Sequence, residues 1–293
     1  MSSSSDHAKG LVITICGVVA ITPDSLLIRL IEADIWTLVF WRGLLMAAGI
    51  LLGLLAVYRG TVWAQFRAIG VNGVLVTLLF TLSTVFFVTA LAYTTVANTL
   101  IIVSAAPLFA ALFSRIFLAE AVPARTWAAI AAALAGIGIL VSGSLGEGTL
   151  AGDLAALGVA TTLAGSFTVM RRGRAVSMVP ATALSGVLSA VIALAMGAPA
   201  AIATDAWAPL LAMGLLVLPI STTLITLGPR YLPAAEVGLL MLLETVLGPL
   251  WVWLALGEEP GPRALIGGAV VVTALALHAL AGLRATRLAA GTA

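Results

Sequence analysis

The sequence predicts an all-α integral membrane protein with ten transmembrane helices, arranged as two inverted five-helix repeats around a central cavity. Of the 293 residues, 62% are hydrophobic and only 9% are charged, whereas charged residues make up about a quarter of a soluble domain. Apolar runs of about 20 residues, the length that crosses a bilayer, follow one another with short polar gaps. One long stretch also occurs twice, which indicates an internal duplication.

The duplicated stretch is Tyr93 to Arg125, and its diverged copy is Tyr231 to Arg263. Each copy has a polar start, an apolar helix with an internal proline and a charged end. The offset is constant, because 231 − 93 and 263 − 125 are both 138. The same offset carries the first apolar span onto the sixth and the fifth onto the tenth. We therefore expect a first repeat at 1–143, a second, inverted repeat at 149–283 and a cytoplasmic tail at 284–293.

Charged or turn residues delimit the spans in order along the chain. The first span contains Pro23 and lacks a small-residue cleavage site, so we expect a retained helix and not a signal peptide. The single cysteine, Cys16, lies in this span and excludes an intrachain disulfide. The ten spans are expected at roughly 10–31, 34–57, 69–91, 95–118, 124–143, 150–171, 179–198, 207–228, 234–256 and 263–283. The breaks fall at Glu32 and Asp34, Arg59 to Arg67, Tyr93 to Val96, Glu120 to Arg125, Gly143 to Gly148, Arg171 to Arg174, Pro199 to Asp205, Arg230 to Pro233 and Glu258 to Arg263.

Five helices per repeat is an odd number, so the second repeat must enter the membrane from the side opposite to the first. With the N terminus in the cytoplasm, eleven basic residues lie at the inner face and two at the outer face, a strong positive-inside bias. We therefore expect a multi-pass protein of the cell (inner) membrane with both termini in the cytoplasm. The inner residues are Lys9, Arg59, Arg67, Arg115, Arg125, Arg171, Arg172, Arg174, Arg230, Arg284 and Arg287, and the outer ones are Arg29 and Arg263.

Two inverted repeats are typical of secondary transporters, because they give two nearly equivalent packings around a site near the middle of the bilayer. A receptor or a non-transporting scaffold has no need of that symmetry. Enzyme motifs such as HExxH, GxSxG, the phosphate-binding GxxxxGK[ST] loop and CxxC are missing. His7 and His278 are too isolated for a metal site, and we expect no cofactor. A net charge of +2 gives no nucleic-acid signal, so the expected partners are a small-molecule substrate and the lipid bilayer, with protons and the oligomeric state left open.

Ionisable residues inside a bilayer are costly and mark functional sites. Asp24 lies about seven residues before the outer end of the first span, and Arg42 about eight residues into the second, so at about 1.5 Å per residue they sit at one depth. We expect them to form an ion pair, which either is structural or handles substrate or protons. Glu244 lies near the middle of the ninth span, where it either serves coupling or substrate contact or bonds a neighbouring helix.

Hydroxyl and amide side chains supply the other candidates for a cavity lining. Thr77, Thr81 and Thr84 are spaced four and three residues apart, so they form one stripe on the third span. Phe87 and Tyr93 would give an apolar wall beside that stripe. Membrane helices also use Ser and Thr to pack and to hydrogen-bond, so each hydroxyl taken singly has a structural alternative. The remaining candidates are Asn98, Ser104, Ser166 and Ser221.

Prolines inside spans predict bends, because each removes a backbone hydrogen bond and clashes with the preceding turn. Pro23, Pro107 and Pro249 are the hinge candidates. Pro107 and Pro249 lie in the fourth and ninth spans, the two copies of the duplicated stretch, where bends would allow rocking. A static kink is the alternative at each of them.

Two stretches resemble the EamA family of the drug/metabolite transporter superfamily. They are AYTTVANTLIIVSAAPLFAALFSRIFLAEAVPARTWAAIAAALAGIGILV, from Ala92, and LPAAEVGLLMLLETVLGPLWVWLALGEEPGPRALIGGAVVV, from Leu232. The likeness includes the short tyrosine loop, the small and apolar helix, the Leu-x-Glu exit and the glycine-rich last helix, and it extends over nearly the whole chain. In detail, TPDSLLIRLIEADIWTLVFWRGLL, from Thr22 to Leu45, is most similar to the YddG-type aromatic amino-acid exporters.

The resemblance implies a bundle with both termini inside and a central cavity lined mainly by spans 1 to 4 and 6 to 9, with spans 5 and 10 peripheral. It also implies export, by alternating access, of aromatic and other neutral amino acids and related metabolites. The alternative is an exporter of other metabolites or of lipophilic cationic drugs. The sequence departs from the family pattern in one respect: Glu244 is followed by Thr245, and the proline that the family often places there is at Pro249.

Overall fold

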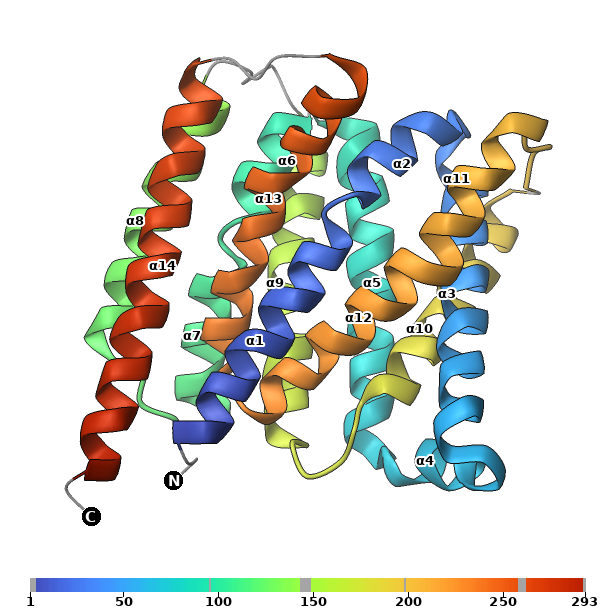
Figure 1. Cartoon of the computed structure of the whole chain (residues 1–293). Coiled ribbons are helices and arrows are strands. Elements are labelled where there is room, and N and C mark those ends of the chain that lie inside the picture. Colours follow the sequence, from blue (N-terminus) through green and yellow to red (C-terminus); the bar gives the residue numbers. More distant parts are fainter. Residues whose placement is uncertain (1–3, 95, 143–148, 198, 258–261, 292–293) are drawn as a thin grey trace.

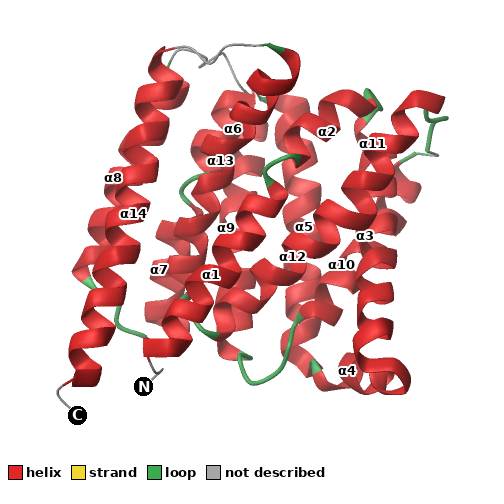
Figure 2. Cartoon of the chain, viewed as in Figure 1, coloured by secondary structure: helices red, strands yellow, loops and turns green. Residues whose placement is uncertain are grey.

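The computed structural model describes residues 4–94, 96–142, 149–197, 199–257 and 262–291, and all of its regular structure over these ranges is helical (Figure 2). In the first half the helices are α1 (Ser4–Ile21), α2 (Asp24–Ile31), α3 (Ile35–Tyr58), α4 (Val62–Ala68), α5 (Gly70–Tyr93), α6 (Val96–Val103), α7 (Ala106–Phe117) and α8 (Ala124–Val141), with the turn η1 (Arg59–Thr61) before α4. In the second half they are α9 (Leu150–Arg172), α10 (Val179–Met196), α11 (Trp207–Ala212), α12 (Leu218–Leu227), α13 (Ala234–Leu256) and α14 (Pro262–Gly291), with the short elements η2 (Thr204–Ala206), η3 (Met213–Val217) and η4 (Gly228–Arg230).

Within the described residues, nine helical segments are long and apolar enough to cross a bilayer, and α8 contributes a shorter apolar helix, Ala124–Leu140. Together they are the ten predicted spans, so the predicted all-helical membrane fold is confirmed. The predicted break at Gly143 to Gly148 lies outside the described residues, as does most of the break from Glu258 to Arg263. α1 begins and α14 ends at the same end of the bundle (Figure 1), which we call the terminal end.

Large apolar side chains remain exposed along the helices. Val57, Val71 and Leu254 are 74%, 76% and 75% exposed. A soluble protein rarely exposes so much contiguous apolar surface, whereas lipid tails accept it. A helix also satisfies its backbone polar groups internally, as the hydrocarbon layer requires. The exposed apolar surface therefore agrees with a chain that spans the membrane.

Helix neighbours occur in pairs that the inverted repeat relates to each other. α5 packs along α9, and α1 packs along α12, so span 3 meets span 6 as span 8 meets span 1. In the same way α7 packs on α9, and α13 packs on α1. Three further contacts join a span to its own copy: α3 with α10, α7 with α13 and α8 with α14. The α8–α14 pair stands at one edge of the bundle (Figure 1), the peripheral place that the resemblance implied for spans 5 and 10.

Glycines allow the closest of these crossings. A Cβ added at Gly43 of α3 would lie 2.5 Å from the carbonyl oxygen of Gly186 in α10, and one added at Gly186 would lie 2.6 Å from that of Gly43. Likewise, a Cβ on Gly136 of α8 would lie 2.9 Å from the carbonyl oxygen of Gly267 in α14. Small residues at helix contacts are the usual means of packing in lipid, where the hydrophobic effect gives no drive for helix association.

Two symmetry-related arginines tie the peripheral helices together. Arg125, at the start of α8, donates through Nη1 to the carbonyl oxygen of Ala281 near the end of α14, at 3.4 Å. Arg263, at the start of α14, donates to the carbonyl oxygen of Ser142 just after α8, also at 3.4 Å. The two arginines are related by the offset, because 125 + 138 = 263. Ser142 follows the last residue of α8, where carbonyls lack an intrahelical partner, whereas Ala281 lies within α14 and its carbonyl accepts from Arg125 as an additional donor.

Helix breaks occur at some of the predicted prolines. The first span is divided into α1 and α2 just before Pro23 and Asp24, and the fourth is divided into α6 and α7, with Pro107 in the first turn of α7. A proline is tolerated there because first-turn N–H groups have no intrahelical acceptor. The ninth span, α13, continues as one helix through Pro249, whose side chain lies outside the described set. The two copies of the duplicated stretch therefore differ in backbone form, and a hinge at any of these prolines stays a prediction.

Candidate functional site

Three ionisable side chains from three different spans lie together inside the bundle. Arg42 of α3 donates through Nη1 to Oδ1 of Asp24 at 2.6 Å. Asp24 is only 6% exposed, and its position at the start of α2 results from the break before it. That position suits a carboxylate, because the N-terminal end of a helix carries partial positive charge. The ion pair predicted from the equal depth of the two residues is confirmed.

Glu244 completes this ionic cluster from α13. It is partly buried, and its carboxylate lies near enough to interact electrostatically with both Asp24 and Arg42. When all three groups are ionised, two carboxylates face one guanidinium. In a low-dielectric interior such an imbalance is costly unless a cation or a proton compensates it. The fully ionised cluster therefore has a surplus of one negative charge, which a proton on a carboxylate or a positively charged group would compensate.

The guanidinium of Arg42 also contacts a distorted part of the eighth span. Nη1 lies 3.2 Å from Sδ of Met213, a fully buried residue that begins the π-helical element η3. π-Helical turns are rare and occur frequently at functional sites. The sequence analysis did not identify this element, because apolar periodicity does not distinguish a π turn from an α turn. Pro219, in the first turn of α12, was the one local signal in the sequence that the span is irregular.

Aromatic side chains surround the same region. Trp251 of α13 donates its indole N–H to Oγ1 of Thr22 at 2.7 Å, so it holds the α1–α2 break from the side of the ninth span. Trp41 packs edge-to-face on Trp207, with ring centroids 5.1 Å apart. These two rings join the apolar cluster that contains Met213. The sequence analysis did not anticipate these tryptophan contacts around the ionic cluster.

The threonine stripe of α5 is engaged in helix packing. Thr77 donates to the carbonyl oxygen of Ala181 at 3.1 Å, and Thr81 donates to those of Thr77 and Ser185 at 2.9 and 3.4 Å. These bonds tie α5 to α10. Thr84 donates within its own helix, to Phe80 at 3.1 Å. The bonds support the structural alternative for the stripe, and a lining role stays a prediction.

The other candidates are spread over the bundle. Ser104, Ser166 and Ser221 are buried, and each donates to a carbonyl oxygen of its own span. Phe87 and Tyr93 are 37% and 57% exposed. None of these has a described contact with Asp24, Arg42 or Glu244, so the described contacts bring together three of the twelve predicted lining residues.

Asn98 belongs to a separate network at the end opposite the terminal end. Its Nδ2 donates to Oγ1 of Thr94 at 3.2 Å, and that hydroxyl donates to Oδ1 of Asp153 at 3.0 Å. Thr149 donates through Oγ1 to the carbonyl oxygen of Tyr93 at 2.8 Å. The network joins the start of the fourth span to the start of the sixth, α9. Asn98 thus lies in a contact between the two repeats and not in the ionic cluster.

Comparisons with known proteins identify a family for the chain and support its fold. The model of the EamA-like transporter family matches residues 8–142 and again residues 150–280. A solved structure, titled only "Crystal structure of protein", aligns with 96% of this chain and 99% of its own, at 20% identity and a TM-score of 0.76. At that identity the likeness speaks for the fold alone. A search of curated proteins gave no match.

Proposed function

The chain belongs to the EamA-like transporter family, a family of membrane transporters and not of enzymes, and we propose that it exports aromatic and other neutral amino acids from the cytoplasm by alternating access. The observation that carries the proposal is the ionic cluster of Asp24, Arg42 and Glu244. It combines both signs of charge on three different spans, at the break between α1 and α2. Intramembrane charges of this kind mark substrate and ion pathways.

A zwitterion fits the charges of the cluster. The carboxylate of an amino acid would approach the guanidinium of Arg42, which offers paired donors to a carboxylate. The ammonium would approach Asp24 or Glu244, which together carry one negative charge more than Arg42 neutralises. The substrate would thereby compensate the surplus, and binding would exchange one set of ion pairs for another.

The neighbourhood of the cluster favours an apolar or aromatic side chain. Trp41, Trp207 and Met213 form an apolar cluster beside Arg42, and Trp251 lies against Thr22 at the break. Aromatic rings pack favourably edge-to-face with other rings and with methionine sulfur. The similarity of Thr22 to Leu45 to the YddG-type exporters adds the expectation of aromatic amino acids. Outward transport follows from the same resemblance, with the terminal end in the cytoplasm according to the distribution of basic residues.

The experiment is exchange in proteoliposomes. Purified protein is reconstituted with internal unlabelled amino acid, and entry of labelled tryptophan is followed. We expect exchange that excess phenylalanine and leucine reduce, and Arg42→Gln should lower it at least tenfold. The matched control is Arg263→Gln, because the bond of Arg263 within the described residues goes to a backbone carbonyl at the bundle edge. No exchange of any amino acid by folded protein, or equal loss in both variants, would overturn the proposal.

A second candidate is export of lipophilic cations, and the negative surplus of the ionic cluster favours it specifically. In that case Glu244→Gln should abolish transport, while loss of Arg42 should be tolerated, since a cation needs no guanidinium. Cells that make the protein supply the discriminating measurement. Better growth in excess tryptophan indicates the amino-acid exporter, and better growth in a cationic dye such as ethidium indicates the alternative.

A further inference from the structure

A second group of titratable side chains is buried at the terminal end, away from the ionic cluster. Glu236, in the first turn of α13, is only 3% exposed. Its Oε2 lies 3.7 Å from Nε2 of His7 on α1, and its Oε1 lies 3.7 Å from Nε2 of His278 on α14. Nη2 of Arg125, at the start of α8, lies 4.0 Å from the same Oε1. One carboxylate thus faces basic groups from three other helices.

The contacts in this group are longer than hydrogen bonds. A charge-assisted N–H···O bond spans about 2.7–2.9 Å, whereas the distances here are 3.7–4.0 Å. Among the described residues, Oε2 of Glu236, Nδ1 of His278 and Nε of Arg125 are buried without a hydrogen-bond partner. With both imidazoles neutral, Glu236 and Arg125 balance each other in charge. One added proton would turn an imidazole–carboxylate contact into an ion pair, and the electrostatic attraction would favour a shorter distance between the two groups.

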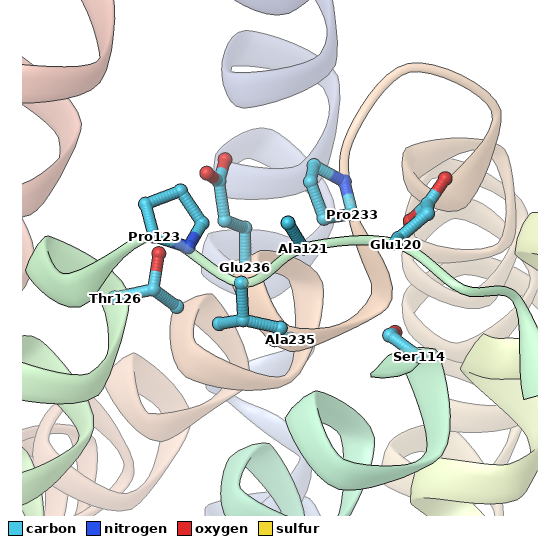
Figure 3. A pocket seen from close by; sticks show the side chains of 9 residues that line it. Ser114, Glu120, Ala121, Pro123, Thr126, Pro233, Ala235 and Glu236 are labelled. Carbon is cyan, nitrogen blue, oxygen red and sulfur yellow. The ribbon is translucent and has the colours of Figure 1, made fainter. Parts of the chain in front are cut away.

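A small pocket lies beside this group. Glu120, Ala121, Val122, Pro123, Pro233, Ala235 and Glu236 form most of its wall, and its space suffices for about one water molecule. Figure 3 shows Glu236 between Pro123 and Pro233, with Ser114 and Thr126 close by. Oγ of Ser114 and Oγ1 of Thr126 are also buried without a protein partner among the described residues. A space of this size, with several polar atoms in its wall, can hold a water molecule next to Glu236.

Three other charged groups near this pocket have described partners of their own. Glu120, across the pocket, pairs with Arg171 of α9 at 2.9 Å. Lys9 of α1 lies over the ring of Tyr231, 5.1 Å from its centroid. Arg230 of η4 donates to the carbonyl oxygen of Arg174 at 3.1 Å. Further charged residues on the adjoining helices toward this end are Asp6 of α1, Arg115 of α7, Arg172 of α9, and Arg284 and Arg287 of α14. The groups with described contacts to Glu236 are therefore the two histidines and Arg125.

Comparison of the two repeats shows that the group around Glu236 occurs at the terminal end and has no equivalent carboxylate at the matching position of the other end. Glu236 is the counterpart of Asn98, because 98 + 138 = 236. At the opposite end Asn98 takes part in the hydrogen-bonded network with Thr94 and Asp153. A neutral amide thus occupies the position that a carboxylate with two imidazoles occupies at the terminal end. A difference between equivalent positions makes the two ends respond differently to pH.

We propose that Glu236, His7 and His278 form a proton-binding site at the terminal end, which water reaches through the small pocket beside Glu236. Binding of a proton tightens the contacts between α13 and helices α1 and α14 and so stabilises the packing of this end. No metal is invoked, since no three His, Cys, Asp or Glu side chains in the described part of the chain are placed so that they could hold a metal ion. The site goes beyond the proposed function, because proton binding does not depend on which substrate is carried.

The chain offers a direct measurement, since its only two histidines are the two in this site. Protein purified without a histidine tag and labelled in its imidazoles would show two NMR signals, assigned with His7→Gln and His278→Gln. Histidines ordinarily change charge between about pH 5 and 8, and a carboxylate nearby favours the charged form. We therefore expect a larger protonated fraction at pH 6 in the wild type than in Glu236→Gln, for both signals.

Glu120→Gln is the control, because it removes a carboxylate from the same pocket but leaves Glu236 in place. It should leave both imidazole signals unchanged. A thermal scan in detergent adds a second readout: the midpoint should rise from pH 8 to pH 6 in the wild type, and this rise should be lost in Glu236→Gln. Signals that do not change with pH, or that change equally in both carboxylate variants, would overturn the proposal. A failure of amino-acid exchange would leave these measurements unaffected, so the two proposals can fail separately.

Discussion

Removing one partner of the Asp24–Arg42 pair should harm the protein more than removing both. Asp24→Asn leaves the guanidinium of Arg42 without the anion that lies 2.6 Å away, and Arg42→Met leaves two carboxylates near each other. Orphaning one partner of a buried pair costs about 3–5 kcal/mol, whereas replacing both by apolar residues of similar volume is often neutral or better. The side chain of Arg42 is 25% exposed, so water moderates the effect, and we expect about 2–3 kcal/mol for each single change.

The assay is reversible unfolding in mixed micelles of SDS and a mild detergent, with Asp24→Leu/Arg42→Met as the double change. The double variant should lie within about 1 kcal/mol of the wild type. The four proteins form a double-mutant cycle, and with these values the coupling free energy is about 3 kcal/mol or more. If the effects of the single changes simply add in the double variant, the two side chains do not stabilise each other and the reasoning is refuted.

Glu244 supplies a sharper test of the same cluster, because its effect should change sign with the background. With Asp24 replaced by Asn, Glu244 is the remaining anion near Arg42, so adding Glu244→Gln should destabilise the protein further. With Arg42 replaced by Met, Glu244 only repels Asp24, so the same change should stabilise. Both effects should be about 1 kcal/mol, the size of an interaction at a few ångströms and high effective dielectric. The same sign in both backgrounds would contradict the electrostatic description of the cluster.

Two further predictions concern packing and the helix break. Gly43→Ala or Gly186→Ala should lower the free energy of unfolding by about 2 kcal/mol or more in the same assay, since the new methyl group meets a backbone carbonyl at the α3–α10 crossing. The control is Gly53→Ala, which should be neutral or slightly stabilising because the space around Gly53 is open. Trp251→Phe keeps an aromatic ring but removes the N–H that bonds Thr22 at 2.7 Å, so it should cost about 1 kcal/mol. Thr22→Val should cost more, because it also removes the hydrogen bond that the hydroxyl donates to the carbonyl oxygen of Val19 at 2.8 Å, and Trp251→Phe should add no further loss in that background.

The ten spans and the inverted repeat could be predicted because the bilayer imposes them on the sequence. A spanning helix needs a long apolar run, and a duplicated gene keeps its register, so the offset of 138 survives where side chains diverge. Depth could also be predicted from position in a span. That is why Asp24 and Arg42 were paired correctly, whereas their third partner, Glu244, could be placed in depth but not in rotation about its helix.

The remaining contacts of the site depend on how each helix is rotated about its axis and how the helices cross. A single sequence gives little information on either. The threonines of α5 have the spacing of a stripe, but whether a stripe faces a cavity or a neighbouring helix is set by packing, and here it bonds α10. His7 and His278 are 271 positions apart, since 278 − 7 = 271, so their meeting at Glu236 follows from the fold alone. The sequence held one signal for this site: the repeat aligns Glu236 with Asn98, so it marks a position where a carboxylate replaces a neutral amide.

Positions at which the two repeats differ indicate where the two halves of the protein have different functions. An inverted repeat alone gives two equivalent packings, one open to each side. Identical ends would leave their relative stability to the membrane potential and the substrate gradient. In this chain the fourth span is divided at Pro107 while the ninth continues through Pro249, and Asn98 is replaced by Glu236 with its two histidines. Each difference is expected to give the two packings unequal free energies, and under our proposal the second makes that inequality depend on pH. If both proposals hold, substrate recognition by the ionic cluster and the choice of open end are carried by different residues, and mutations should separate them.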